Sequence, residues 1–195
     1  MENSKQSFDQ IRLADDRGQT AVVVELCKKH LQQFPKHGIA WLYFGMAQCD
    51  LARYAAAEKS IRRAITLCPE KALPIAYSRL GHLFQAKGDL KQAEFWYRKA
   101  VKRKPQDATY HIFLASNAFK GGFLKKSAAI YNRALKCSEG CLEEACFNLG
   151  GILLGQRKYS EAIKCYEEAL KIDPKYKIAK TRLDDARLAL LLANT

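Results

Sequence analysis

The sequence repeats itself with a period of about 35 residues, and this period constrains the fold more than any other feature. Three sets of small residues recur at successive separations of 36, 34 and 35 residues. They are Gly45, Gly81, Ala115 and Gly150; Ala57, Ala93, Ser127 and Ala162; and Ala64, Ala100, Ala134 and Ala169. Because a fixed period of roughly 20 to 50 residues is typical of stacked structural repeats, we predict that each repeat packs against its neighbours along the chain.

Prolines and glycines divide each repeat into two helices. Four prolines recur with the same period, each after a stretch of helical periodicity: Pro35, Pro69, Pro105 and Pro174. A proline ring lacks an N–H and clashes with the preceding helical turn, so it ends a helix. Three glycines fall between two helical stretches: Gly18, Gly88 and Gly122. Asp89 is placed to cap the helix that follows it, and the repeat that contains Ala115 has Glu139 and Gly140 where proline is expected. Each repeat is therefore predicted to be a helical hairpin.

With these positions in place, the sequence resembles the tetratricopeptide-repeat family. The stretch AWLYFGMAQCDLARYAAAEKSIRRAITLCP has the residues typical of that family, in order: Trp41, Gly45, Tyr54, Ala57, Ile61, Ala64 and Pro69. The resemblance implies an all-α right-handed superhelix of helical hairpins, forming one domain over residues 4–176. The expected repeats are 38–71, 74–107, 108–141 and 143–176, preceded by a degenerate repeat at 4–37.

The small residues are predicted to allow close packing between the two helices of a hairpin. Gly45 and its counterparts let the first helix of a hairpin contact the second. The small residues of the two alanine columns, on the second helix, allow the same close approach. The first repeat differs, because it has Ile11, Val23 and His30 at these positions. We therefore interpret it as an atypical capping hairpin.

Residues 177–195 depart from the repeat pattern and are predicted to form a C-terminal capping helix. One side of this helix is expected to cover the last repeat with Ile178, Leu183, Ala186 and Leu190. Three further leucines, Leu188, Leu191 and Leu192, leave additional apolar surface that offers a contact for a homodimer.

The resemblance implies that the first helices line a concave face. The residues expected there are mostly apolar or aromatic, which suits a peptide anchored by its side chains. The candidate peptide contacts are Leu42, Tyr43, Met46, Arg79, His82, Phe113 and Asn148, with Ile112, Phe119 and Phe147 on the same face. The alternative is that several aromatic residues belong to the core, or that a helix of the chain fills the groove. Some relatives bind chaperone tails through a clamp of lysine, asparagine and arginine; Arg79 is the only good match, so this clamp is disfavoured.

The second helices carry a basic face. Its residues are Lys28, Lys29, Arg62, Arg63, Arg98 and Lys99, and the corresponding positions of the last repeat are Glu167 and Glu168. With a net charge of +13, this stripe supports an alternative function, the binding of RNA or an anionic membrane. The simpler interpretation is a solvated surface, because Glu25, Glu58 and Glu94 are spaced to pair with the cations along each helix.

No catalytic or metal-binding motif emerges from the sequence. Cys137, Cys141 and Cys146 have an unusual spacing for zinc, and Cys146 lies in a column that is expected to be core. The glycine-rich stretch at 150–155 lies in a predicted helix and lacks the lysine and hydroxyl residue of a phosphate-binding loop. We expect no enzyme activity, no cofactor and no bound metal.

Composition indicates the compartment. The start of the chain has no basic patch leading into an apolar segment, which argues against a secretory signal. No apolar run approaches the roughly 20 residues that span a bilayer. The cysteines number seven, and this odd number excludes a complete set of disulfides. We expect a soluble, cytoplasmic protein with reduced thiols. Its predicted function is that of a protein-interaction scaffold, adaptor or chaperone-like protein for a peptide. A secretion or pilus-assembly chaperone is a further alternative.

Overall fold

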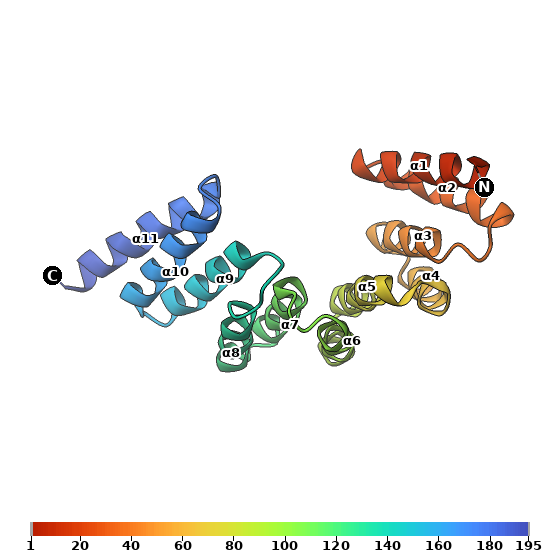
Figure 1. Cartoon of the computed structure of the whole chain (residues 1–195). Helices are drawn as coiled ribbons and strands as arrows, with labels where there is room; N and C mark the ends of the chain where they lie inside the picture. Colours follow the sequence, from red (N-terminus) through yellow and green to blue (C-terminus); the bar gives the residue numbers. More distant parts are fainter. Residues whose placement is uncertain (1, 195) are drawn as a thin grey trace. The chain divides into compact units, whose positions relative to one another are not determined.

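The computed structural model describes residues 2–194, which form α-helices joined by short turns, with no β-strand in that range (Figure 1). The first six α-helices are α1 (Glu2–Asp16), α2 (Thr20–Gln33), α3 (Gly38–Asp50), α4 (Tyr54–Leu67), α5 (Leu73–Ala86) and α6 (Leu90–Arg103), with a 3-10 turn η1 (Glu70–Ala72) before α5. The other five are α7 (Ala108–Lys120), α8 (Leu124–Ala134), α9 (Leu142–Gly155), α10 (Tyr159–Ile172) and α11 (Lys177–Ala193). The predicted all-α class is confirmed.

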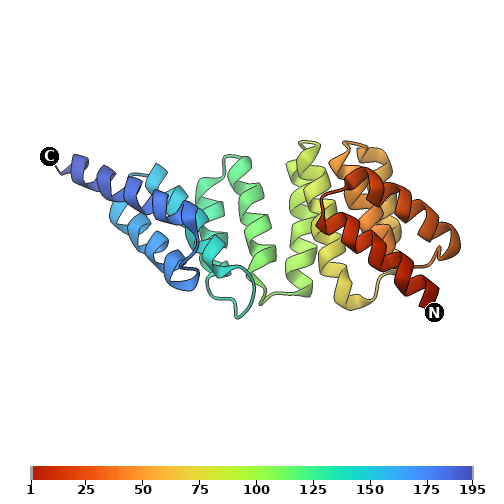
Figure 2. The same cartoon turned by 90° about the horizontal axis from the view of Figure 1, so that it is seen from above.

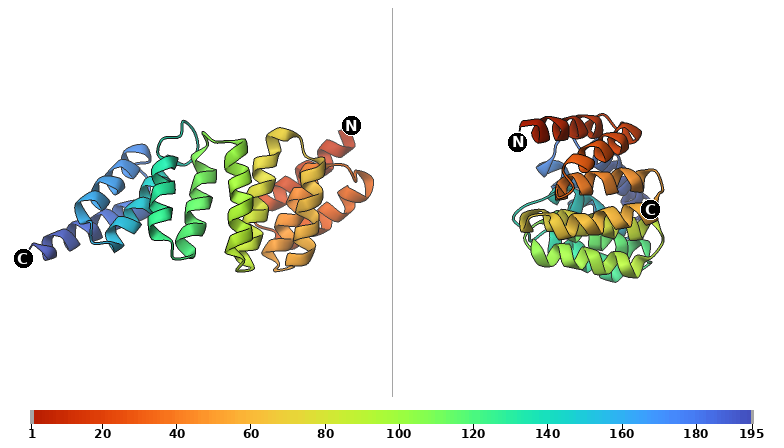
Figure 3. Two further views of the ribbon diagram at one scale, coloured as in Figure 1. Left: turned by 90° about the horizontal axis from the view of Figure 1, so that it is seen from below. Right: turned by 90° about the vertical axis from the view of Figure 1, so that its right-hand side faces the viewer.

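The helices gather into two compact units. Unit 1 contains α1 to α6 and ends at Arg103, and unit 2 begins at Lys104 and contains α7 to α11. Within each unit, every helix packs against the next one along the chain. Figures 2 and 3 show this arrangement for α7 and α8, which lie side by side. The division of residues 4–176 into five repeats of one domain stays a prediction.

A residue with a positive φ angle recurs in the turn between the two helices of each pair. Three of these residues are glycines, Gly18, Gly88 and Gly122, at φ angles of 65°, 80° and 78°. Ala52 and Arg157 hold the equivalent places at 56° and 60°. Glycine adopts this conformation without strain, whereas other residues rarely do. These turns therefore share one backbone conformation, although two of them lack the glycine that would indicate it in the sequence. The predicted cap is also present, because Gln92 N donates to Asp89 Oδ1 at 3.0 Å.

The small-residue columns lie where paired helices come closest. A Cβ atom added to Gly45 would lie 2.5 Å from Ile61 Cγ1, and one added to Gly150 would lie 2.8 Å from a ring carbon of Tyr166. In the hairpin of α7 and α8, Ala115 is fully buried and its carbonyl accepts a hydrogen bond from Ser127 Oγ at 2.8 Å. These contacts confirm that the small residues permit close packing.

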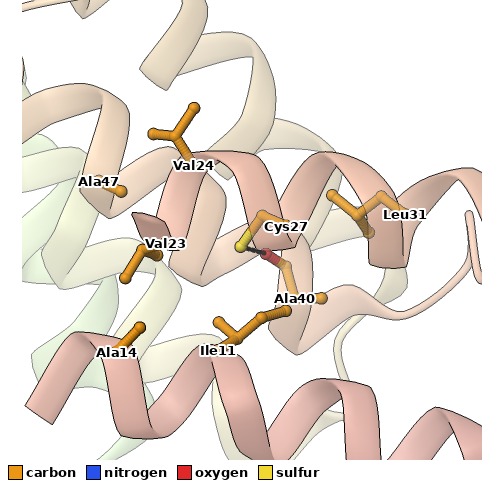
Figure 4. Packing of buried hydrophobic residues seen from close by; sticks show 8 residues of the cluster. All are labelled: Ile11, Ala14, Val23, Val24, Cys27, Leu31, Ala40 and Ala47. Carbon is orange, nitrogen blue, oxygen red and sulfur yellow. Dashed lines mark hydrogen bonds between the residues drawn. The ribbon is translucent and has the colours of Figure 1, made fainter. Parts of the chain in front are cut away.

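The first hairpin packs around larger side chains. The core formed by α1, α2 and α3 contains Ile11, Ala14, Val23, Val24, Cys27, Leu31, Ala40 and Ala47 (Figure 4). Ile11 is fully buried and Val23 is 1% exposed, so the bulky residues that distinguish this repeat are themselves core residues. The Cys27 thiol approaches the Ala40 carbonyl at 3.8 Å, which ties α2 to α3.

A buried histidine also links these three helices. His30 on α2 is 2% exposed, and its Nδ1 lies 2.7 Å from Ser7 Oγ of α1. Its Nε2 lies 2.6 Å from Nδ1 of His37, the residue before α3. Burial, and secondly the neighbouring His37, lower the pKa of His30, and burial lowers the pKa of His37. Both imidazoles are therefore held in the neutral form.

We expect the free energy of unfolding of unit 1 to fall as the pH drops below about 6.5. The unfolded histidines take up protons there, whereas the folded ones, with lowered pKa values, resist protonation. Tryptophan fluorescence during urea unfolding reports on this unit, because Trp41 and Trp96 both lie in it. In His30→Gln the loss of stability between about pH 7.5 and pH 5.5 should shrink. The control His111→Gln, in unit 2, should leave that loss unchanged; an unchanged loss in His30→Gln would refute the prediction.

In unit 2, Gly140 allows the loop between α8 and α9 to pack against the start of α7 (Figure 2). Ala108 N donates to the Glu139 carbonyl at 2.8 Å, and Asp107 caps α7 by accepting from Thr109 N at 3.0 Å. A Cβ on Gly140 would lie 2.6 Å from Asp107 Oδ1, and Gly140 has a φ of 95°. Here a loop contact takes the place of the proline found in the other repeats.

The helix α11 packs against α10 and α9. Leu183 and Ala186 are buried as predicted, but Ile178 is 61% exposed and Ala179 is buried in its place. The prediction for Ile178 was wrong because its neighbour, one position along, occupies the buried side of the first turn. Three leucines of α11 are more than half exposed: Leu188, Leu191 and Leu192. A homodimer through them stays a prediction.

Between residues 2 and 194, none of the helices has the length and apolar character needed to cross a membrane.

Candidate functional site

Unit 2 contains a cavity of about 590 Å³ that opens among its five helices. The residues that line it are Ser116 and Phe119 of α7, Tyr131 of α8, Phe147, Asn148, Gly151, Ile152, Leu154 and Gly155 of α9, Tyr166 of α10 and Arg182 of α11. Most of the wall therefore comes from α9, and α11 adds a cation.

The wall of this cavity is largely aromatic and aliphatic. Phe119 is 49% exposed, and Phe147 packs against Tyr166 with ring centroids 5.9 Å apart. Gly151 and Gly155, one helical turn apart on α9, are exposed and carry no side chain to fill the space. The nearest atom to a Cβ added at Gly151 would be the Tyr166 hydroxyl oxygen, at 3.9 Å. The glycines thus leave room for a ligand to approach the helix backbone.

Among the polar side chains that line the cavity are Asn148 of α9 and Arg182 of α11. Asn148 forms a hydrogen bond with Glu144. Burial, then the charge of Glu143, raise the pKa of Glu144, and the bond from Asn148 opposes that rise. Arg182 lies 3.3 Å from Asp185 in an exposed ion pair, which contributes little in water. Its guanidinium is consequently available to an anionic group of a ligand.

The predicted groove residues of unit 1 do not line this cavity. Tyr43 and Met46 on α3 and Arg79 and His82 on α5 are half-buried. The Nε of Arg79 is buried and has no hydrogen-bond partner in the part of the chain that the structure describes. His82 Nδ1 lies 2.9 Å from the Tyr97 hydroxyl, so it contributes to the packing of α5 on α6.

Two residues of the predicted inner face are buried. Leu42 is 4% exposed and Ile112 is 2% exposed, so neither can contact a peptide. The prediction for Leu42 was wrong because it points into the core while Tyr43, the next residue, is partly accessible. Phe113 is half-buried and packs edge-on against Tyr110 at 6.3 Å. Of the candidate contacts, the structure places Asn148 in the cavity, together with Phe119 and Phe147.

The six residues of the basic face are exposed. Three of them form ion pairs along their own helices: Lys28 with Glu25 at 2.7 Å, Arg62 with Glu58 at 3.0 Å and Arg98 with Glu94 at 2.8 Å. The other three, Lys29, Arg63 and Lys99, have no carboxylate within ion-pair distance among residues 2–194. On each of α2, α4 and α6, one of the two adjacent cations is therefore neutralised by a glutamate and the other, over the described range, is not.

Sequence reasoning missed two groups of residues. Arg182 lies on a helix outside the repeat pattern, and the spacing of Gly151 and Gly155, one helical turn apart, was the signal for the glycine-lined side of the cavity. Phe95 and Trp96, which contact Lys99, were also missed. The spacing of Phe95 and Lys99, four residues apart on a helix, is a signal for such a contact.

The described residues contain no group of three histidine, cysteine, aspartate or glutamate side chains able to hold a metal ion. Cys146 is 3% exposed, in agreement with the core position expected for it.

Comparison with protein families identifies the repeats. Two segments, residues 75–107 and 143–176, match models of the tetratricopeptide repeat. The chain belongs to the tetratricopeptide-repeat family. Tetratricopeptide repeat protein 12 of Mus musculus is 28% identical over 124 residues, 63% of this chain and 18% of that protein. The tetratricopeptide repeat-containing protein trd-1 of Caenorhabditis elegans is 26% identical over 87 residues, 45% of this chain and 10% of that protein.

Solved tetratricopeptide-repeat structures share the fold. The C-terminal part of a repeat-containing protein from Cytophaga hutchinsonii superposes with a TM-score of 0.74 at 17% identity, covering 94% of this chain and 71% of that chain. A protein from Thermus thermophilus superposes with a TM-score of 0.68 at 21% identity, covering 95% and 99%. YrrB, a tetratricopeptide-repeat protein with an unusual peptide-binding site, has a TM-score of 0.60 at 15% identity, covering 90% and 89%.

The family assignment carries a general expectation about activity. Tetratricopeptide-repeat proteins are in general non-enzymatic scaffolds for protein interactions. The chain spans less than a fifth of the length of the curated relatives described above, so their activities and partners do not transfer to it directly. The function of a repeat protein depends on the surface residues of the particular chain.

Proposed function

We propose that this chain is a non-enzymatic protein-interaction scaffold, an adaptor or chaperone-like protein, which binds a peptide segment of a partner in the cavity of unit 2. The observation that carries the proposal is the cavity of about 590 Å³, with aromatic walls, a glycine-lined side and polar groups that include Asn148 and Arg182. Peptide sites in proteins typically combine apolar pockets with a few polar groups that fix orientation.

Each part of the cavity suits a different part of a peptide. Phe119 and Phe147 provide apolar surface for a hydrophobic side chain, and Gly151 lets the peptide backbone come close to α9. The Asn148 amide has both a donor and an acceptor for a backbone amide of the peptide. Arg182 suits a carboxylate, either an acidic side chain or a C-terminus.

The other predicted peptide contacts, which do not line the cavity of unit 2, stay candidates for additional contacts with a partner. Tyr43, Met46, Arg79 and His82 are partly accessible and stay candidate peptide contacts within unit 1, and Phe113 stays one within unit 2. YrrB, which shares the fold, is a precedent for peptide binding on this architecture. We further propose a cytoplasmic location, because an odd number of cysteines suits a reducing compartment.

Selection from a random peptide display library with the full chain as bait tests this function. Peptides that bind wild type should bind Asn148→Ala about fivefold to tenfold more weakly, because a buried backbone amide of the peptide loses its partner. The control Asn132→Ala changes an exposed asparagine on α8 and should leave affinity unchanged. Failure to enrich any peptide, or equal affinity for Asn148→Ala, would remove the support for this site.

The alternative of RNA or anionic-membrane binding through the basic face receives less support. Binding to a phosphate backbone depends on many cations acting together. Three of the six cations in this stripe are already paired with glutamates. The role of a secretion or pilus-assembly chaperone is compatible with the same cavity and depends on which partner is found.

A further inference from the structure

A cluster of aromatic rings surrounds one cation in unit 1. The Nζ of Lys99 lies 4.7 Å from the ring centroids of both Phe95 and Trp96 on its own helix α6. It lies 5.7 Å from the Tyr77 ring of α5. Arg62 of α4 places its guanidinium 5.4 Å from the Trp96 centroid. Two cations from different helices therefore approach one tryptophan.

The charges in this cluster are not equally neutralised. Arg62 forms an ion pair with Glu58 at 3.0 Å. Lys99 has no carboxylate within ion-pair distance among the residues that the structure describes, although its ammonium group is fixed by the rings. Trp96 is 7% exposed, and its indole N–H has no acceptor within the described chain. The cluster thus holds several hydrogen-bond donors and an unneutralised cation.

The rings hold the lysine in position and provide apolar surface beside it. Cation–π contacts stabilise an ammonium group over a ring face, so Lys99 is held more firmly than an isolated surface lysine. Phe95 is 49% exposed and stands next to it. A ligand that fits has a negative group for Lys99 and an apolar group for Phe95.

We propose that the cluster of Tyr77, Phe95, Trp96 and Lys99 is a docking site for an acidic segment of a partner protein, in which a carboxylate stands beside an apolar side chain. The charge of the site is complementary to such a segment, and the half-exposed ring matches its apolar residue. This site is separate from the cavity of unit 2, so it does not depend on the function proposed above.

A single-stranded nucleic acid fits this surface less well. Strands of that kind stack successive bases on several exposed rings. Here Phe95 is half exposed, Tyr77 is half-buried and Trp96 is buried. The neighbouring cations Arg62 and Arg98 are each paired with a glutamate one turn away. A discrete contact with a carboxylate is therefore favoured over a continuous track for phosphates.

The test uses the full chain and a short fluorescein-labelled peptide of repeating Glu-Glu-Leu, at about 150 mM salt, where distant charges are screened. Fluorescence anisotropy should show binding to wild type, and Lys99→Gln should weaken it about tenfold. Phe95→Ser should weaken it about fivefold, and Lys99→Arg should restore most of the affinity because arginine also stacks on rings.

The matched control is Lys29→Gln, an exposed lysine of α2 with no ring contact in the described residues, which should change affinity by less than about twofold. A peptide of repeating Gln-Gln-Leu should not bind. The proposal is overturned if the acidic peptide does not bind wild type, or if Lys29→Gln and Lys99→Gln weaken it equally. Tighter binding of a labelled oligouridylate than of the acidic peptide would also overturn it.

Discussion

Replacing Gly140 by alanine is expected to lower the free energy of unfolding of unit 2 by about 3 kcal/mol, through two effects that act at one residue. The φ angle of 95° lies in a region that residues with a Cβ rarely adopt. The added Cβ would also lie 2.6 Å from Asp107 Oδ1 and 2.8 Å from the backbone nitrogen of Ala108. The Ala108 nitrogen belongs to the backbone, so the clash with it is relieved only if the loop between α8 and α9 moves away from the start of α7.

Gly122→Ala is the matched control, because Gly122 also has a positive φ but no atom within 4 Å of an added Cβ. Strain alone should reduce its stability by about 1 kcal/mol. Urea unfolding followed by far-ultraviolet circular dichroism measures both variants. Similar losses in the two would mean that the loop between α8 and α9 yields without losing its contact with α7.

Replacing Gly151 by leucine is expected to abolish peptide binding to unit 2 while the fold is kept. The glycine is exposed on the cavity wall, and a Cβ there meets only the Tyr166 hydroxyl at 3.9 Å. The rest of the leucine side chain would occupy space that a peptide needs. Leucine also favours the helix over glycine by about 0.8 kcal/mol, so stability should rise while affinity falls by more than about a hundredfold.

Gly151→Ala separates these two effects. It gives a similar increase in helix stability, about 1 kcal/mol, but adds one carbon in ordinary contact distance. Peptides selected on wild type should therefore bind Gly151→Ala with affinity within about threefold of wild type. Unchanged affinity in Gly151→Leu would show that the peptide binds elsewhere.

Much of the fold could be predicted from the sequence because the packing is encoded by residues of small size. Gly45 and Gly150 recur since a side chain there would meet Ile61 or Tyr166 on the paired helix. Helix ends were predicted from proline and from Asp89. The turn at Ala52 was not, because alanine gives no sign of the left-handed conformation that it adopts there.

The candidate contact residues were harder to predict, because the first helices of the hairpins are apolar on several sides. Leu42 and Tyr43 are adjacent and both apolar in character, so periodicity alone could not decide which one points outward. Consecutive residues on a helix differ in direction by about 100°, and a shift of one position exchanges core for surface. Arg182 was missed for a different reason: it reaches the cavity from α11, whose sequence follows no repeat.

The unpaired thiols of the hairpins, of which Cys27 and Cys146 are buried and Cys49, Cys68 and Cys165 are half-buried, have a practical consequence. Burial raises the pKa of Cys27 to about 12 and that of Cys146 to about 11, and it also raises the pKa values of Cys49, Cys68 and Cys165. Since the thiolate is the form that alkylating reagents attack, these residues react slowly near neutral pH until the surrounding helices open. Three of them lie in unit 1 and two in unit 2. The rate of alkylation at each of these cysteines, followed by mass spectrometry, therefore measures local opening of the hairpin that contains it, without any added label.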